Sequence, residues 1–241
     1  MNTGRKDSDE VRRLRRTIED MKALLALPAM LADLGPENIA DRLAKVLSSI
    51  LDLDLVYVRL VQSGNSGFTE TVRSKHRPDA DSCISDVRAS LASLLTGAGA
   101  ALVPVMAVPD PFGTSTLRTT VTRLSLVEEH DVLVAGSQRA SFPVEQERLL
   151  LEFAANQVAL ILQRQRAEQT LQQSEERFRG FADAAPAILW VTEPDGFCCF
   201  ISQGWYEFTG QGEGEGLGYG WLDAMHPDDR EEATKHFLSA N

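Results

Sequence analysis

The chain has 241 residues, of which 43% are hydrophobic and 24% are charged, a composition typical of a soluble globular protein with one large or two smaller domains. Its formal net charge of −11 argues against general nucleic-acid binding, which needs a basic face to meet phosphate. No window approaches the ~20 apolar residues of a membrane-spanning helix, and the polar N-terminus lacks the apolar run of a signal peptide. The three cysteines, Cys83, Cys198 and Cys199, form no disulfide framework, which predicts a reducing, cytoplasmic setting.

The first predicted element is an amphipathic helix within residues 1–28. Its apolar residues recur at spacings of three and four, as in a coiled-coil seam. They are Val11, Leu14, Ile18, Met21 and Leu25. The seam covers only about two and a half heptads before Pro28 ends the pattern. Pairing in a coiled coil and packing on its own domain therefore remain equally open.

Residues 29–162 predict helices alternating with strands. The expected elements are a helix from Pro36, strands at 53–60 and 68–73, a helix at 86–95, extended segments at 100–108 and 117–127, a strand at 131–136 and a closing helix from 144. The stretch from Val132-Leu-Val-Ala-Gly136 through Phe142-Pro-Val-Glu145 to Leu162 resembles the last strand and closing helix of a GAF domain. The order of the elements suits that fold.

The closing helix is expected to continue through residues 163–178. This segment is polar, contains neither Gly nor Pro, and consists almost entirely of good helix formers. Residues 144–162 are apolar nearly all round, as expected of a helix buried on a sheet and against a partner. A thin apolar seam then continues along the helix, at Leu160, Ala167, Leu171 and Phe178. A polar helix with so thin a seam suits a rod between domains.

Residues 179–241 carry a specific order of motifs. Two predicted strands, at about 187–192 and 197–201, flank the turn Pro194-Asp195-Gly196. The motifs Trp205-Tyr-Glu-Phe-Thr-Gly210 and Gly220-Trp-Leu-Asp-Ala-Met-His-Pro-Asp-Asp-Arg230 follow. This order resembles the front half of a PAS sensor domain. The family fold is a five-stranded sheet of usually ~100 residues. The resemblance therefore implies an incomplete domain, whose three closing strands are expected beyond Asn241.

Two motifs in this last segment could suggest a bound ligand. Six glycines alternate from Gly210 to Gly220, but they match neither phosphate-binding glycine pattern, and Glu213 and Glu215 would repel phosphate. A flexible loop is the favoured interpretation. His226-Pro-Asp-Asp229 could suggest a metal, but proline followed by carboxylates is typical of a helix start. No metal site is predicted.

No cofactor is expected, and no nucleophile–base pair suggests catalysis. Haem-binding PAS domains use a helix histidine, for which His236 is the minor alternative. Cys198-Cys199 does not match the Asn-Cys-Arg-Phe-Leu motif of flavin photoreceptor PAS domains. The tetrapyrrole-bearing cysteine of GAF photoreceptors is usually followed by His, whereas Ile84 follows Cys83. His76 and His130 lie in predicted loops without a recognisable catalytic set.

The prediction is an α/β (α+β) chain with a GAF-type antiparallel sheet and flanking helices, a long linker helix, and the first half of a PAS fold. The resemblance implies a non-catalytic sensory module of a bacterial two-component sensor histidine kinase. A sensory module of a cyclic-dinucleotide cyclase or phosphatase, and a stand-alone ligand-binding or scaffold protein, are the alternatives. The implied partners are a second copy in a parallel homodimer, an unidentified small-molecule signal, a kinase core beyond Asn241 and a response regulator.

Overall fold

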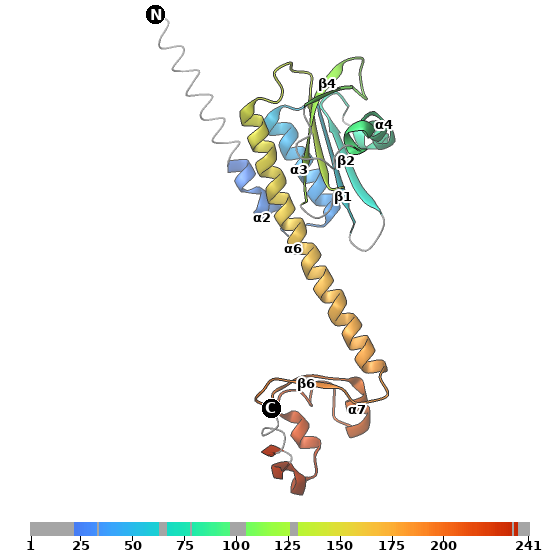
Figure 1. Cartoon of the computed structure of the whole chain (residues 1–241), viewed down its shortest axis with the longest axis vertical. Helices are drawn as coiled ribbons and strands as arrows, with labels where there is room; N and C mark the ends of the chain where they lie inside the picture. The colour runs from blue at the N-terminus through green and yellow to red at the C-terminus, as the bar shows by residue number, and fades with distance from the viewer. Residues whose placement is uncertain are drawn as a thin grey trace, which may run out of the picture. The chain divides into compact units, whose positions relative to one another are not determined.

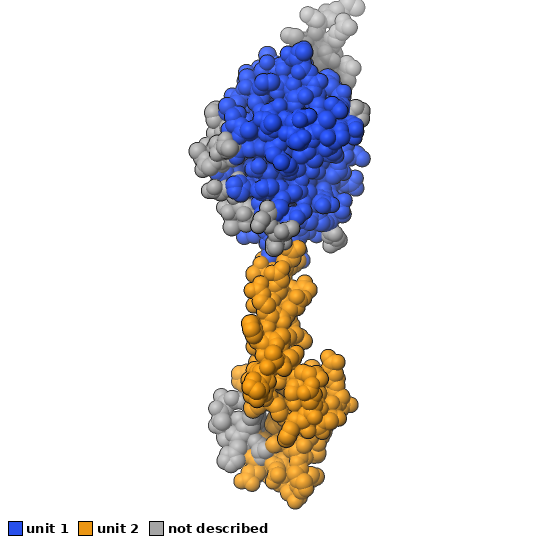
Figure 2. All heavy atoms as spheres, turned by 90° about the vertical axis from the view of Figure 1, so that its right-hand side faces the viewer, with its two compact units in different colours: residues 1–166 blue, residues 167–241 orange. Residues whose placement is uncertain are grey.

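The computed structural model describes residues 22–32, 34–62, 67–77, 79–96, 105–125, 130–232 and 234–235. They belong to two compact units, residues 1–166 and residues 167–241, which Figure 2 colours separately. One element, the 40-residue helix α6 (Glu145–Ala184), contributes to both units. Four residues of the predicted N-terminal seam lie outside the described residues, namely Val11, Leu14, Ile18 and Met21.

Unit 1 is built on a five-stranded antiparallel sheet with the order β2-β1-β5-β4-β3 (Figure 1). Its strands are β1 (Leu55–Val61), β2 (Phe68–Ser74), β3 (Met106–Pro109), β4 (Thr116–Arg123) and β5 (Val132–Ser137). The neighbours β1 and β5 are buried along nearly their whole length. Burial on both faces explains why their sequences are almost continuous apolar runs rather than alternating ones.

Helices cover both faces of this sheet (Figure 1). On one face lie α2 (Leu27–Leu31), α3 (Pro36–Leu51) and the first half of α6. On the other lie η1 (Ala80–Cys83), α4 (Ile84–Ser90) and α5 (Ala92–Thr96). Because successive strand residues point to opposite faces, Val58 joins the first core and Tyr57 the second. The α+β fold class with an antiparallel sheet and flanking helices is thereby confirmed.

One local expectation for unit 1 was wrong. The helix expected over residues 86–95 is broken at Leu91, which leaves the helical region at φ −93° and ψ 2° and separates α4 from α5. Leu91 and Leu94 are nevertheless buried, so core packing prevails over helix continuity. The helical pattern before Pro28 is interrupted at Ala26, and Pro28 itself lies in the first turn of α2, where its missing N–H costs nothing.

Unit 2 contains the end of α6, a two-stranded hairpin, a short helix and two 3₁₀ turns. These elements are β6 (Trp190–Thr192), β7 (Cys198–Ile201), α7 (Gln203–Thr209), η2 (Gly220–Ala224) and η3 (Pro227–Asp229). Both strands were predicted, but each is shorter than expected. Helix α6 continues past its predicted end at Phe178 as far as Ala184; in this last part Ala182 is buried, and Asp183 Oδ1 accepts from the Gln203 amide (2.7 Å).

Candidate functional site

The seam predicted on α6 lies on an exposed face of the helix. Leu160, Leu171 and Phe178 expose 61%, 72% and 48% of their surfaces, and Ala167 is exposed as well. Leu25, the described residue of the N-terminal seam, is 66% exposed. Large apolar side chains in a row on a surface are typical of an interaction site.

Two phenylalanines that the sequence reasoning missed extend this face. Phe153 and Phe181 are 36% and 77% exposed. Phe153 lies one heptad before Leu160, and Phe181 lies one heptad after Ser174, so they share the heptad position of Leu160 and Ala167. The signal that identifies both is the seven-residue repeat through Leu160 and Ala167, which includes positions 153 and 181.

The opposite face of α6 packs into unit 1, where Leu151, Ala154, Val158 and Leu162 are buried. Residues 144–162 were expected to be buried nearly all round. In the single chain only one face is covered, and Leu149 on the other side is 54% exposed. The helix is thus bound to the sheet along one stripe and presents a second apolar stripe to solvent.

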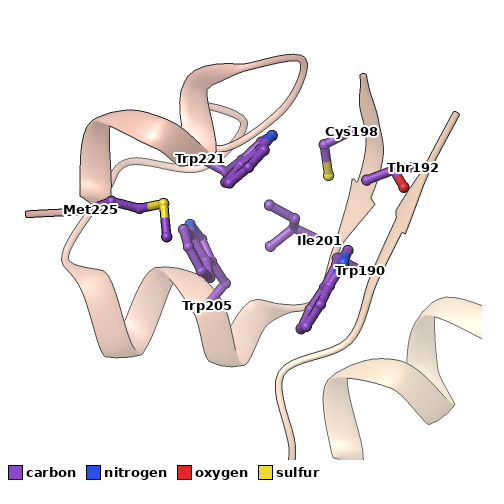
Figure 3. Close-up of a pocket in the computed structure, with 7 residues that line it drawn as sticks. All are labelled: Trp190, Thr192, Cys198, Ile201, Trp205, Trp221 and Met225. Carbon is purple, nitrogen blue, oxygen red and sulfur yellow. The ribbon is translucent and has the colours of Figure 1, made fainter. Parts of the chain in front are cut away.

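Unit 2 contains an apolar cavity of about 250 Å³ between the hairpin and the turns that follow α7 (Figure 3). Seven residues line it: Trp190, Thr192, Cys198, Ile201, Trp205, Trp221 and Met225. All three tryptophans of the chain are among them. Tryptophan emission will therefore report on unit 2 alone.

Hydrogen bonds hold the walls of this cavity in place. The Trp205 indole Nε1 donates to Gln211 Oε1 (2.7 Å), and Gln211 Nε2 donates to the Gly220 carbonyl (2.9 Å). Ser202, which is completely buried, accepts a hydrogen bond from the Leu189 amide through its side chain (3.0 Å). The cavity is thus a fixed part of the fold of unit 2.

The glycine-rich segment at 210–220 is a loop, as predicted, but it is packed against the hairpin. Gly218, at φ +63°, exchanges two backbone hydrogen bonds of 2.8 Å with Cys198. Gly216 is buried, and a Cβ there would lie 2.9 Å from Trp205 Nε1 and 3.0 Å from Ile201 Cδ1. Close packing, rather than phosphate binding, accounts for glycine at this position.

The adjacent cysteines of β7 have opposite environments. Cys198 is buried beside the cavity, and burial raises the pKa of its thiol above the ordinary value, whereas Cys199 is exposed. Because the thiolate is the reactive form, we expect iodoacetamide to label native Cys199 at least ~10-fold faster than Cys198. The measurement compares Cys199→Ser and Cys198→Ser variants by peptide mass spectrometry, with denatured protein as the control. Equal rates in the native state would contradict the burial of Cys198.

The other candidate residues form no recognisable chemical site. His226 caps η3, accepting from the Asp228 amide at Nδ1 (3.4 Å), so the motif does begin a helical turn. Within the described part of the chain, no group of three His, Cys, Asp or Glu residues could hold a metal ion. His236 lies outside that part. Cys83 is half-buried, and its thiol contacts the Ser82 hydroxyl (3.6 Å).

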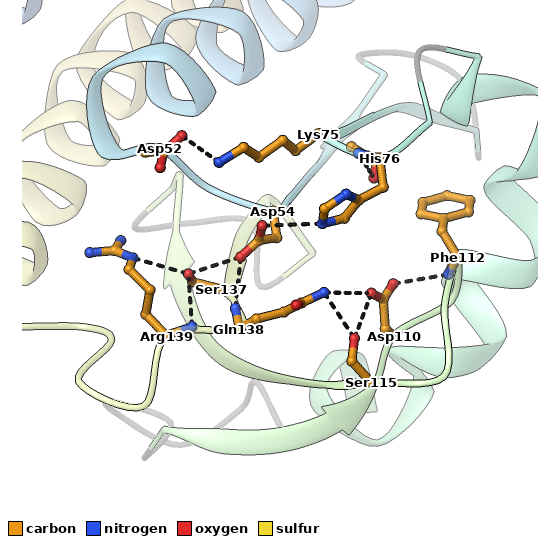
Figure 4. A network of polar contacts seen from close by, with 11 residues as sticks. Asp52, Asp54, Lys75, His76, Asp110, Phe112, Ser115, Ser137, Gln138 and Arg139 are labelled. Atoms are coloured by element: carbon orange, nitrogen blue, oxygen red, sulfur yellow. Dashed lines mark hydrogen bonds and ion pairs between the residues drawn. The ribbon is translucent and has the colours of Figure 1, made fainter.

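A polar network lies at one end of the sheet in unit 1 (Figure 4). Asp54 is its centre: its Oδ2 accepts from the Ser137 hydroxyl (3.0 Å) and the Gln138 amide (2.7 Å), while its Oδ1 lies 3.4 Å from His76 Nε2. Serine, aspartate and histidine are thus together, but the serine contacts the carboxylate and not the imidazole. The order differs from that of a nucleophile–base pair, and the contacts join the residue before β1 to the end of β5.

The second carboxylate of this network belongs to Asp110. It accepts hydrogen bonds from the Phe112 amide (2.9 Å), the Ser115 hydroxyl (3.0 Å) and Gln138 Nε2 (3.3 Å). Gln138 therefore joins Asp54 to Asp110 through its backbone and its side chain. The Asp110 carboxylate is thus satisfied by neutral donors of the chain, as expected of a network that fixes loops.

Comparison with known proteins gives limited likenesses. No protein-family model matches the chain. The uncharacterized protein y4lL of Sinorhizobium fredii (strain NBRC 101917 / NGR234) is 43% identical over 77 residues, which are 32% of this chain and only 9% of that much longer protein. The crystal structure of the GAF domain of a predicted sensor histidine kinase from Pseudomonas syringae pv. tomato aligns at 17% identity and a TM-score of 0.43, covering 72% of this chain and 99% of that chain. A TM-score this low carries no weight for fold or function.

In the part of the chain that the structure describes, no helix combines the length and the hydropathy needed to cross a membrane.

Proposed function

We propose that this chain is a sensory and signal-relay module of a bacterial two-component sensor histidine kinase, and that it works as a parallel homodimer. In this proposal residues 1–28 form an N-terminal helix, 29–162 a GAF domain, 163–178 a signalling linker and 179–241 the first half of a PAS domain. The motifs of the sequence support the two domain assignments. The α+β architecture of unit 1 is compatible with the first of them.

The observation that carries the proposal is the exposed apolar stripe on α6. Apolar side chains at heptad spacing are wholly or partly exposed in the single chain, at Phe153, Leu160, Ala167, Leu171, Phe178 and Phe181, of which Phe178 also contacts Phe200. Transferring a leucine side chain out of water contributes on the order of 1.5–3 kcal/mol. A second copy in parallel register would cover this stripe with the same stripe of its own. Arg164 lies within the seam and would weaken the pairing.

The experiment that tests the dimer replaces Leu160 and Leu171 by aspartate. We expect sedimentation velocity to show a dimer for the unmodified chain at tens of micromolar and a monomer for the double variant. The dissociation constant should rise at least ~100-fold, because both helices lose two buried leucines and gain like charges. Far-ultraviolet circular dichroism should stay unchanged, since both side chains are exposed in the monomer.

The matched control places aspartate at Gln169 and Gln173, which are exposed but lie outside the seam. This variant adds the same charge to the same helix and should remain dimeric. Aspartate at Leu14 and Ile18 probes the N-terminal part of the predicted seam in the same way. An unmodified chain that is monomeric at these concentrations would remove the basis for a dimeric relay.

For unit 2 we propose that further β-strands pair with the hairpin and cover the cavity. Isolated two-stranded hairpins are marginal in water. Trp190 and Val191 on β6 are 57% and 43% exposed, and the cavity is lined almost wholly by apolar side chains. Extending the chain with the residues that follow Asn241 in the parent gene should shift tryptophan emission to the blue. An unchanged emission spectrum would speak against a half-complete PAS domain.

The same extension separates the kinase from its alternatives. A phospho-accepting histidine box after the PAS domain would identify a kinase, and a Gly-Gly-Asp/Glu-Glu-Phe motif would identify a cyclase. A stop codon would favour a stand-alone binding or scaffold protein. The three free cysteines support a cytoplasmic location in each case.

A further inference from the structure

We propose that the ion pair between Asp131 and Arg166 couples the sheet of unit 1 to helix α6. The pair attaches α6 to the sheet at Arg166, the last residue of unit 1. Movement of the strand ends around Asp131 therefore changes the stability of α6 from residue 167 onward. Only the biological use of this coupling, as a signal relay, rests on the function proposed above. The coupling itself is a property of one chain.

The carboxylate of Asp131 is completely buried and lies where three strands meet. Asp131 directly precedes β5, and its Oδ1 accepts from the amide of Val61, at the end of β1 (2.7 Å). Its backbone carbonyl accepts from the amide of Leu124, just after β4 (2.8 Å). One residue thus holds the ends of β1, β4 and β5.

Among the described residues, the Asp131 carboxylate forms its one ion pair with a residue of α6. Arg166 Nη1 lies 2.7 Å from Asp131 Oδ2, and Arg166 Nη2 donates to the Val61 carbonyl (3.2 Å). The preceding residue, Gln165, donates through Nε2 to the Leu34 carbonyl (3.0 Å) and the Ala32 carbonyl (3.3 Å). Two consecutive side chains therefore attach the helix to the sheet and to the chain after α2.

Beyond these two residues the character of α6 changes. Unit 1 ends at Arg166, and every residue at positions 167–181 is exposed. The last core leucine of the helix, Leu162, lies one turn earlier. Arg166 is therefore the boundary between the packed and the exposed part of α6.

The chemistry of the pair gives it two distinct states. A buried carboxylate without its guanidinium is strongly unfavourable, so the pair is either formed or the strand ends must move to admit water. Partial displacement is not a stable alternative in a closely packed interior. A bistable contact that both the sheet and the helix influence is what coupling between two sites requires.

The test uses the reciprocity of coupling, because whatever the sheet does to the helix, the helix does equally to the sheet. Gln169→Gly loosens the exposed part of α6 without touching unit 1. Hydrogen exchange is then followed at the amides of Val61 and Leu124, which both donate to Asp131. In the otherwise unmodified chain we expect Gln169→Gly to speed their exchange at least ~3-fold.

The same substitution is then made in the neutral Asp131→Asn/Arg166→Gln background. This background leaves no unpaired charge in the core, so unit 1 should stay folded even where Arg166→Gln alone unfolds it. We expect Gln169→Gly to have no effect on Val61 and Leu124 there. Equal acceleration in both backgrounds, or none in the unmodified chain, would overturn the inference.

A matched control uses Arg179→Gln, which removes the exposed pair of Arg179 and Glu175 on the same helix. In that background the effect of Gln169→Gly on the two reporter amides should persist. Sedimentation of the same samples records the oligomeric state independently. A monomeric chain that retains the coupling would refute the proposed dimer and leave this inference intact. A dimer without the coupling would refute this inference and leave the proposed dimer intact.

Discussion

Replacing Gly220 by alanine is expected to unfold unit 2 while unit 1 remains folded. A Cβ at this position would lie 1.9 Å from the Glu215 carbonyl oxygen, a backbone atom that no side-chain rotation can remove. The loop must therefore open, and it carries the Gly220 carbonyl that Gln211 uses to hold Trp205. Overpacking of this kind typically costs about 1–3 kcal/mol and occasionally more, which a unit with a two-stranded sheet can hardly sustain.

Tryptophan emission measures this result without interference, because all three tryptophans lie in unit 2. We expect a red shift for Gly220→Ala in native buffer, with the sheet of unit 1 still protected from hydrogen exchange. The matched control is Gly204→Ala in α7, where the nearest atom to a new Cβ is 3.9 Å away. That variant should stabilise α7 by about 0.5–1 kcal/mol. Native-like emission from Gly220→Ala would show that the loop is not packed as described.

Unit 1 is expected to lose stability steeply at alkaline pH because of one phenol. Tyr57 is completely buried, and its hydroxyl donates to Glu70 Oε1, which also accepts from Arg88 Nε (3.0 Å). Burial raises the pKa of Tyr57 far above its ordinary value, and the hydrogen bond and charge of Glu70 raise it further, against smaller opposite effects of Arg59 and Arg88. The native state therefore keeps a proton that the unfolded chain gives up.

The direction of the pH dependence follows from this difference in proton binding. The stabilisation that protonated Tyr57 gives to the native state is complete below about pH 10, the ordinary pKa of tyrosine. It is lost as the pH rises above this value. As the pH rises, the free energy of unfolding should fall more steeply in the unmodified chain than in Tyr57→Phe. The difference in slope should reach up to about 1.4 kcal/mol per pH unit, which is the effect of one proton. Denaturant unfolding followed by far-ultraviolet circular dichroism at increasing pH measures both slopes.

The control for this experiment is Tyr219→Phe, which removes a half-exposed tyrosine from unit 2. Its slope in the unit 1 transition should match that of the unmodified chain. Parallel slopes for the unmodified chain and Tyr57→Phe would mean that Tyr57 ionises within the folded state, in conflict with its burial.

Elements whose signal is local were predictable from the sequence. The helix from Pro36 and the apolar runs that became β1 and β5 carry their periodicity within a few residues, and the structure contains each of them. The exposed stripe of α6 was likewise readable from heptad spacing, although Phe153 and Phe181 were missed. Local patterns fix which residues share a face, because that depends only on the repeat of the helix or strand.

Tertiary structure alone decided which distant residues meet. Nothing near Asp131 in the sequence indicates Arg166, and nothing near Trp205 indicates that Gln211 and Gly220 would hold its indole in place. The break at Leu91 arose in the same way, since burial of Leu91 and Leu94 in a core outweighed local helix propensity. A sequence specifies its periodicities directly, whereas contacts between residues far apart in the chain exist only once the sheet and its helices have packed.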